Sequence, residues 1–430
     1  MDPQGRQAER SHHSLSFMEK TADSLTGLAM GGFVGDAIAM PVHWYYDRSA
    51  LRHDYGTVRD YTAPKSPHPG SILWRSEYTA INERGNILHD QARYWGQRGI
   101  HYHQFLRAGE NTLNLQLAKV LMDSLITCGD YDADDYLTRY IDFMLTPGKH
   151  RDTYVEECHR KFFTAYARGT APRKCAGTDI HIGGLAHVGV LSTYFRGDLD
   201  ATREAVREHV SLTHRSPEVL AAADAMVRMA CDLLKGLPLR EAILAHGSDW
   251  FSQRKALEWS KDPDEVVIGR RVSPACYIAE AFPASLYLAW KYADDFESGV
   301  TANANVGGDN CHRGACDRRF DWRGCGRFTD ASKVCRWHRR CHPPQRSDRN
   351  HRHSSMKTNL SSEQASFVVR LAWEDRTSFE EIRERTGFVE SQVIDLMRRE
   401  LKPSSFRCWR KRVSGRVTKH RKLLELRLKG

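Results

Sequence analysis

The side chains that could hold a metal ion are most densely gathered near residue 309 of this 430-residue chain. Gly307 and Gly308 allow the backbone to turn sharply, and Asp309, Cys311 and His312 follow where a helix should begin. Carboxylate, thiolate and imidazole donors at one turn are typical of a cation site. A plain helix start with Asp309 as the N-cap explains the same residues equally well.

Two earlier stretches carry similar donors. From Phe17 the apolar residues recur at helical spacing, and Pro41 should end this helix with Asp36 and His43 near its C-terminal end. In the second stretch, Gly109 precedes a helix with an apolar face, so three polar residues lie at the helix N-terminus. They are Glu110, Asn111 and Thr112. Capping of the helix would also explain these three residues.

A glycine-containing turn over residues 179–186 is predicted between two helices. Its backbone amides could face a ribose or a phosphate group, with His181, Gly183 and Gly184 in contact with the ligand. Two glycines without a further signature are weak evidence for such a site.

The elements that must position these groups are predicted to be helices. Ser216 caps and Pro217 opens one helix, whose leucines and methionines are expected in the core. Residues 61–104, rich in proline and aromatic side chains, are expected to form a long surface excursion. Strand signals are scarce, so residues 17–315 are expected to form an all-α domain after a disordered N-terminus over 1–16.

Composition limits where the chain could work. The net charge of +10 is concentrated after residue 315. The C-terminal part is therefore the basic part of the chain, and residues 1–315 are not. The eleven cysteines form no regular framework, and we find neither a signal peptide nor a long apolar span. We therefore expect a cytoplasmic protein without a membrane partner.

Four motifs in this order resemble one family. They are Gly-Asp-Ala at 35–37, Glu-Asn-Thr at 110–112, Thr-His-Arg-Ser-Pro at 213–217 and Gly-Gly-Asp at 307–309. Together they resemble the ADP-ribosylglycohydrolases over about residues 18–315. The resemblance implies an orthogonal all-helical fold and a pair of magnesium ions that orient a ribose and the attacking water. It also implies hydrolysis of an ADP-ribosyl bond to a protein, a nucleic acid or a small molecule.

Carried over by position, the resemblance gives a partly altered site. Glu110 and Asp309 are expected as catalytic bases, and Asp36, His181, Gly183 and Gly184 as substrate-binding residues. The expected metal ligands are His43, Glu110, Asn111, Thr112, Asp309, Cys311 and His312. His43, Cys311 and His312 replace the oxygen donors of the family, so zinc or iron is an alternative to magnesium. The alternative function is a catalytically inactive, ligand-binding relative.

Residues 316–355 differ from everything before them, because cysteines and histidines are scattered among many arginines. We expect a disordered basic linker. With GC-rich codons assumed, reading one base later after Ala315 restores the Gly-, Ala- and Ile-rich helix expected of the family. The hypothesis is a frameshift that truncates the helical domain. A zinc knuckle using Cys335, His338 and Cys341 is the weaker alternative.

Residues 356–430 are expected to form a small helical domain. Ser378 caps a helix, Gly387 turns the chain and another helix follows, which is typical of a helix-turn-helix core. The segment resembles a family of short bacterial proteins of unknown function. Its basic residues could bind DNA, or could form only a solvated tail. The predicted nucleic-acid contacts are Gln392, Arg398, Arg399, Arg410, Lys411 and Arg412.

Overall fold

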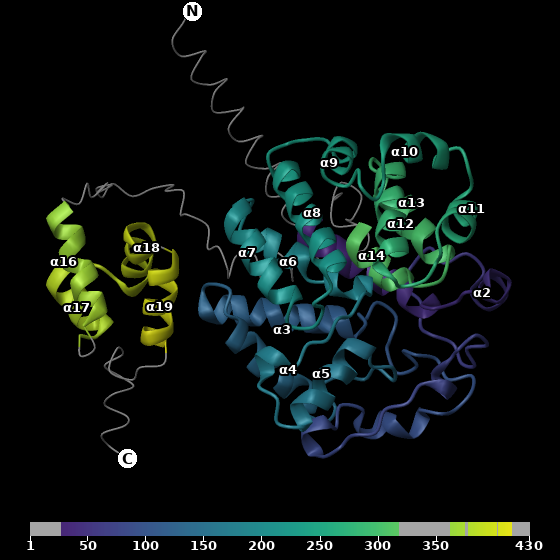
Figure 1. Cartoon of the computed structure of the whole chain (residues 1–430), viewed down its shortest axis with the longest axis horizontal. Coiled ribbons are helices and arrows are strands. Elements are labelled where there is room, and N and C mark those ends of the chain that lie inside the picture. Colours follow the sequence, from purple (N-terminus) through teal and green to yellow (C-terminus); the bar gives the residue numbers. More distant parts are fainter. Residues whose placement is uncertain (1–26, 318–361, 375–376, 402, 415–430) are drawn as a thin grey trace, which may run out of the picture. The chain divides into compact units, whose positions relative to one another are not determined.

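The computed structural model describes residues 27–317, 362–374, 377–401 and 403–414 (Figure 1). The chain divides into two compact units, Met1–Pro344 and Gln345–Gly430. In the described parts of both units, no helix is both long and apolar enough to cross a membrane. Three predictions concern residues outside those described. They are the disordered N-terminus, almost all of the basic linker with its zinc-knuckle alternative, and the frameshift.

The first unit is built from helices. A helix over residues 27–39 is followed by α2 to α14, and the described residues contain isolated β-bridges but no strand. The α-helices are α2 (Arg48–Tyr55), α3 (Leu113–Cys128), α4 (Ala133–Leu145), α5 (Glu157–Ala167), α6 (Val188–Tyr194), α7 (Leu199–Val210), α8 (Pro217–Leu234), α9 (Leu239–His246), α10 (Gln253–Trp259), α11 (Asp264–Val266), α12 (Ile278–Lys291), α13 (Phe296–Asn305) and α14 (Asn310–Asp317).

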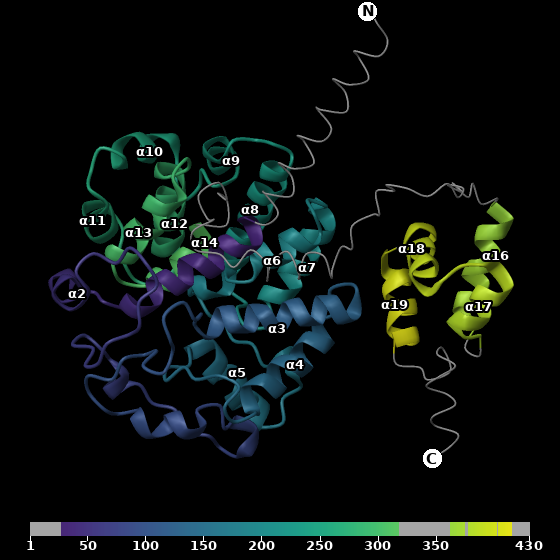
Figure 2. The same cartoon turned by 180° about the vertical axis from the view of Figure 1, so that it is seen from behind.

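Short helical turns fill the connections between these helices. They are η1 (Met40–Val42), η2 (Leu73–Arg75), η3 (Glu83–Gly85), η4 (His89–Tyr94), η5 (Pro172–Lys174), η6 (Ile182–Leu185) and η7 (Val267–Arg271). Both views show α3 running between the α4–α5 region and the α6–α8 region (Figures 1 and 2). The all-α class expected from the sequence is confirmed.

Local signals set several helix boundaries as predicted. The helix over 27–39 stops just before Pro41, which opens the tight turn η1. Thr112 is the N-cap residue of α3. Ser216 accepts a hydrogen bond from the backbone N–H of Glu218 at 3.2 Å, and Pro217 is the first residue of α8. The methionines and leucines on the inner face of α8 are core residues, as expected.

The segment expected as a surface excursion is instead partly internal. It contains only short 3-10 turns, yet His68, His101, Tyr102 and His103 are buried. The Tyr102 hydroxyl accepts a hydrogen bond from the backbone N–H of Ile72 at 2.8 Å. Side chains of this kind satisfy backbone groups that have no helical partner, so irregular chain can enter the interior.

The second unit is a small helical bundle of α16 (Ser362–Trp373), α17 (Phe379–Thr386), α18 (Glu390–Glu400) and α19 (Pro403–Ser414). Ser378 accepts a hydrogen bond from the backbone N–H of Glu381 at 3.1 Å, which makes it the N-cap predicted for α17. Gly387 has φ 77° and turns the chain between α17 and α18. Trp409 is fully buried, and its indole N–H donates to the Ala372 carbonyl at 2.9 Å.

Candidate active site

Two glycines place Asp309 at the start of α14. Gly307 and Gly308 have φ 69° and 66°. A Cβ on Gly307 would lie 2.2 Å from the Tyr45 carbonyl oxygen, and a Cβ on Gly308 would lie 2.3 Å from the Pro274 carbonyl oxygen. The glycines therefore let the turn approach residues 44–45, with Trp44 N–H donating to Gly308 O at 2.8 Å and Gly308 N–H to Tyr45 O at 2.7 Å. This pairing brings two segments together that are more than 260 residues apart in sequence.

Asp309 lies between two imidazole rings at the centre of the site. Its Oδ1 is 2.8 Å from His43 Nε2 and 2.7 Å from His312 Nδ1. All three side chains are buried, and their ligand atoms lie within 4.8 Å of one another. The other carboxylate oxygen, Asp309 Oδ2, is buried without a hydrogen-bond partner among the described residues. We call His43, Asp309 and His312 the Asp309 cluster.

A chain of buried side chains supports His43 from the side opposite Asp309. His43 Nδ1 is 2.8 Å from His103 Nε2, and His103 Nδ1 is 2.5 Å from Asp152 Oδ1. The Trp44 ring stacks on the His43 ring with 3.8 Å between centroids. His43 is therefore held in one orientation by contacts on three sides.

A second carboxylate lies on the far side of His312. Glu156 Oε1 is 3.0 Å from His312 Nε2, and the Asn114 amide lies 3.0 Å from the same nitrogen. A Cβ on Gly183 would come within 3.0 Å of both Asn114 Nδ2 and Glu156 Oε2. Glycine at 183 therefore lets η6 approach this side of the site.

The charges of the site are strongly coupled. Burial alone would raise the pKa of Asp309, but His312 and His43 outweigh burial and hold this pKa well below its ordinary value. Burial also opposes ionisation of Glu156, yet His312 lowers its pKa to about 2. The two carboxylates raise the pKa of His312 well above its ordinary value, although burial opposes this. Two buried carboxylates are therefore stable beside His312 only if this residue or a bound cation carries a positive charge.

Three of the predicted residues form a separate hydrogen-bond network beside α3. Asp36 is fully buried, and it accepts from the Thr112 hydroxyl at 2.6 Å, the Thr112 N–H at 2.9 Å and the Asn111 amide at 3.0 Å. This network links the helix over 27–39 to the N-terminus of α3. The three residues bond to one another and are not part of the Asp309 cluster, although Asp36 is close enough for the charge of His103 to affect its pKa.

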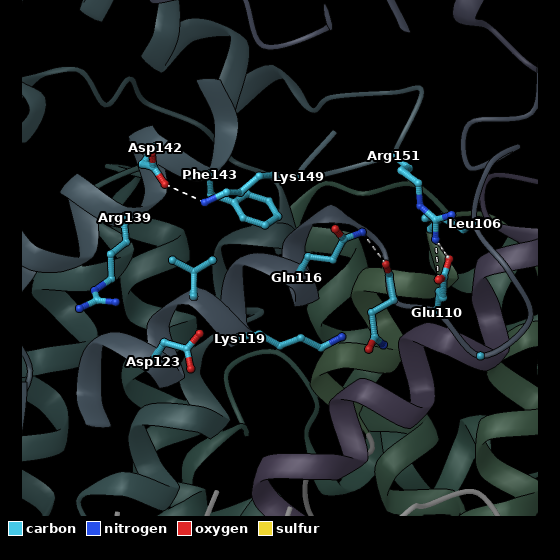
Figure 3. A pocket seen from close by; sticks show the side chains of 13 residues that line it. Leu106, Glu110, Gln116, Lys119, Asp123, Arg139, Asp142, Phe143, Lys149 and Arg151 are labelled. Atoms are coloured by element: carbon cyan, nitrogen blue, oxygen red, sulfur yellow. Dashed lines mark hydrogen bonds and ion pairs between the residues drawn. The ribbon is translucent and has the colours of Figure 1, made fainter. Parts of the chain in front are cut away.

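Glu110 also lies outside the cluster. Its carboxylate pairs with Arg151 at 2.5 Å, and both residues line a cavity of about 610 Å³ on the outer side of α3, with Lys119 and Lys149 (Figure 3). Cys311 points elsewhere too, because its thiol is 3.6 Å from the Asp36 carbonyl oxygen in an apolar environment. Glu110 and Cys311 therefore lie apart from the three residues of the Asp309 cluster, and their roles as metal ligands stay predictions.

Four residues of the site were missed from the sequence: His103, Asn114, Asp152 and Glu156. Asn114 carried a usable signal, since it is a polar residue between Leu113 and Leu115 on a helix face that is otherwise apolar. Asp152 and His103 lie in irregular chain, where no periodicity indicates which side chains point inward.

Half-exposed aromatic residues connect the cluster with the surface. Tyr46 is 49% exposed, and burial of its hydroxyl together with the nearby charge of Asp309 raises its pKa. His181 stacks on Tyr277, which is 50% exposed, and Ile182 N–H donates to Cys276 O at 2.9 Å. The predicted residue His181 therefore belongs to a partly exposed rim (Tyr46, His181, Cys276 and Tyr277), whereas Gly184 packs against His214.

The donor set was compared with the magnesium pair that the sequence resemblance implies. Magnesium prefers hard oxygen ligands in octahedral geometry. The nearest groups to Asp309 are two imidazole nitrogens, and both oxygens of Asp36 already accept hydrogen bonds. A magnesium pair does not fit this set. Two imidazoles and one carboxylate, whose Oδ2 has no hydrogen-bond partner among the described residues, suit one zinc or iron ion instead.

The family model of the ADP-ribosylglycohydrolases matches residues 18–316 of this helical chain. The chain belongs to this family. One solved structure, titled an ADP-ribosylglycohydrolase-related protein complex, matches with a TM-score of 0.52 and 19% sequence identity. The match covers 75% of this chain and 98% of the other, and it confirms the predicted fold.

Two further comparisons complete this result. Residues 366–429 match the model of a protein family of unknown function, DUF2805, which confirms the resemblance expected for the second unit. No curated protein matches the chain.

Proposed function

We propose that this chain hydrolyses an ADP-ribosyl glycosidic bond at the Asp309 cluster. The observation that carries the proposal is His312, held at 2.7 Å from Asp309 and 3.0 Å from Glu156 inside the domain of an ADP-ribosylglycohydrolase. Most enzymes that hydrolyse glycosidic bonds use two carboxylates, and Asp309 and Glu156 are two carboxylates joined through His312. Family membership supplies the reaction class, and this geometry supplies the groups.

A single divalent metal completes the site in this proposal. His43, Asp309 and His312 would hold it, and the chemistry of the donors favours zinc or iron over magnesium. Such an ion supplies Lewis-acid chemistry and a positive charge that orients the ribose hydroxyls. The His103–Asp152 pair keeps the His43 ring in place for this role.

Glu156 takes the place that the sequence suggested for Glu110. Its side chain is 16% exposed, whereas that of Asp309 is fully buried, so Glu156 is the more accessible carboxylate. We assign it as the base that removes a proton from the attacking water. The water oxygen bonds to the anomeric carbon, the glycosidic bond breaks, and the leaving group takes up a proton. Asp309 contributes its charge and its place in the metal set.

The rim residues are proposed to contact the ADP-ribosyl group. Tyr46 and Tyr277 offer half-exposed aromatic faces, on which an adenine ring can stack. His181 of this rim directly precedes η6, whose Gly183 approaches Glu156. The leaving group, whether protein, nucleic acid or small molecule, would extend into solvent. The cytoplasmic location expected from the sequence stays a prediction.

The test is release of ADP-ribose by the full chain. We expect free ADP-ribose from at least one of three substrates, namely protein modified on arginine, protein modified on serine, and ADP-ribosylated DNA, in buffer with added zinc or ferrous iron. Binding of ADP-ribose by calorimetry without release from any substrate would contradict hydrolysis and favour the inactive, ligand-binding relative.

A second candidate function concerns the second unit, for which we propose nucleic-acid binding. Arg398 and Arg399 on α18 and Arg412 on α19 are exposed, and exposed arginines can contact phosphates. Gln392 is engaged as a cap, because its Oε1 accepts from Val389 N–H at 3.0 Å. Arg410 is half-buried, and the side chain of Lys411 is outside the described residues.

Salt-dependent gel shifts test this second function. We expect the full chain to bind duplex DNA with an affinity that falls steeply with salt, and Arg398→Ala with Arg399→Ala to reduce the slope by about one for each lost contact. An affinity that does not depend on these arginines would contradict the proposal.

A further inference from the structure

A second group of metal-binding side chains lies next to the active site and takes no part in it. Cys158 on α5, Asp179 before η6 and His214 before α8 are all buried, with 2 to 3% exposure. Their ligand atoms lie within 4.8 Å of one another. We call these three residues the Cys158 cluster. They come from three separate segments, so the fold alone brings them together.

Residues outside the cluster form hydrogen bonds with two of its atoms, Asp179 Oδ1 and His214 Nδ1. His181 contributes its backbone N–H at 2.9 Å and its ring Nδ1 at 2.7 Å to Asp179 Oδ1. The Thr213 hydroxyl is 2.8 Å from His214 Nδ1. These contacts orient the carboxylate and the ring, as outer contacts do for the ligands of protein-bound metals.

Two other polar atoms of the cluster form no hydrogen bond with the described residues. Asp179 Oδ2 and His214 Nε2 are buried, and neither has a hydrogen-bond partner among the described residues. His214 Nε2 and Asp179 Oδ1 are 3.5 Å apart. Buried polar atoms are almost always partnered, so two orphan atoms beside one thiol require an explanation.

We propose that Cys158, Asp179 and His214 form a second metal site, with zinc as the best-matched ion. Thiolate sulfur, imidazole nitrogen and carboxylate oxygen are the donors that zinc takes in proteins. Tetrahedral zinc ligands lie about 3.3 to 3.8 Å apart, so side-chain shifts of about 1 Å would close the site. On binding, the thiol gives up its proton and its sulfur bonds to the metal.

A small cavity borders one member of the cluster, His214. It has a volume of about 20 Å³ and is lined by His214, His159 and Gly184 among others. A volume of about 10 to 15 Å³ is enough for one water molecule. A water in this cavity would lie beside His214 and is the fourth ligand that we propose.

The position of this site defines its role. Cys158 is two residues from Glu156, and Gly184 packs against His214 while its neighbour Gly183 approaches Glu156. A metal here would tie α5, the residue 179 segment and the start of α8 to one point. The site is structural, and it fixes the positions of Glu156 and η6.

The test is cobalt binding by the full chain after removal of bound metal. Cobalt bound to a thiolate gives a near-ultraviolet charge-transfer band, and the described Asp309 cluster contains no cysteine. We expect this band in the natural protein, its loss on addition of zinc, and its loss in Cys158→Ser. His43→Ala should keep the band, which separates this result from the proposed hydrolytic function.

Matched variants keep the test decisive. Cys311→Ser, also buried but with its sulfur against the Asp36 carbonyl, should retain the band. If Cys158→Ser does not fold, His214→Gln should keep the fold and weaken cobalt binding at least tenfold. The absence of a band in the natural protein would overturn the proposal. So would a band that persists in Cys158→Ser and disappears when Cys335 and Cys341 are replaced.

Discussion

Consecutive glycines of η6 contact the surroundings of the Asp309 cluster and of the Cys158 cluster. We nevertheless assign the first cluster to catalysis and the second to structure. Gly183 approaches Asn114 and Glu156 on one side, and Gly184 packs against His214 on the other. Both clusters are buried, but the first lies near the half-exposed Tyr46. In the second cluster, His214 lines a cavity of about 20 Å³, which Asn114 and Gly183 beside the first cluster also line. Access to a substrate, more than the type of donor, separates a reaction centre from a structural site.

The largest expected effect comes from Asp309→Asn. Loss of this charge leaves His43 and His312 without their common partner, so ADP-ribose release should fall by about 10²- to 10⁴-fold. The cobalt band of the Cys158 cluster should not change. Release assays and absorbance spectra check the two readouts, with Asp142→Asn on the surface as the control. If Asp309→Asn reduced ADP-ribose release and the cobalt band to the same extent, the two clusters would not have separate functions.

His103→Gln should have the next largest effect on hydrolysis. His103 connects His43 to Asp152, and loss of such an orienting partner typically costs about 10- to 100-fold in activity or metal affinity. Steady-state kinetics should show a lower kcat with little change in KM. The control is His89→Gln, whose ring contacts the Met144 carbonyl instead. A change confined to KM would show that His103 acts on substrate binding.

The two glycines of η6 provide a paired test. In Gly184→Ala the new Cβ would lie 2.7 Å from the His214 ring, so we expect about 1 to 3 kcal/mol lower stability and a weaker cobalt band. In Gly183→Ala the contacts are at 3.0 Å with Asn114 and Glu156, so hydrolysis should fall by about tenfold or more. Urea unfolding, cobalt spectra and release assays distinguish them. If the two variants had the same stability, cobalt band and rate of ADP-ribose release, the two glycines would not support different clusters.

Glu110→Gln should have the smallest effect. Glu110 pairs with Arg151, and both side chains are more than a third exposed, so the pair contributes less than about 1 kcal/mol. We expect unchanged hydrolysis and unchanged metal content. A large loss of activity would return Glu110 to the catalytic role that its sequence position suggested.

Parts of this site could be predicted from the sequence because they depend on local signals. Capping residues and glycines indicated where helices begin, and the family resemblance led us to expect His43, Glu110 and Asp309 at one site, whereas Glu110 pairs with Arg151. The structure places the side chains of His43 and Asp309 2.8 Å apart across 266 residues of sequence.

Other parts depended on details that local signals do not contain. Glu110 and Asn114 are close in sequence, but only Asn114 lies on the helix face that points to His312. His103 and Asp152 are carried by irregular chain, whose path follows from packing. The Cys158 cluster combines three residues without any shared motif, so only the coordinates bring it to attention.

The most direct test of the central claim is a metal titration of the metal-free full chain, followed by ADP-ribose release. With zinc or ferrous iron, release should rise to a plateau, and Asp309→Asn should show no such rise. Magnesium should not restore release above the metal-free level. Full activity with magnesium, or the same titration curve in Asp309→Asn, would contradict the assignment of the Asp309 cluster as the hydrolytic centre.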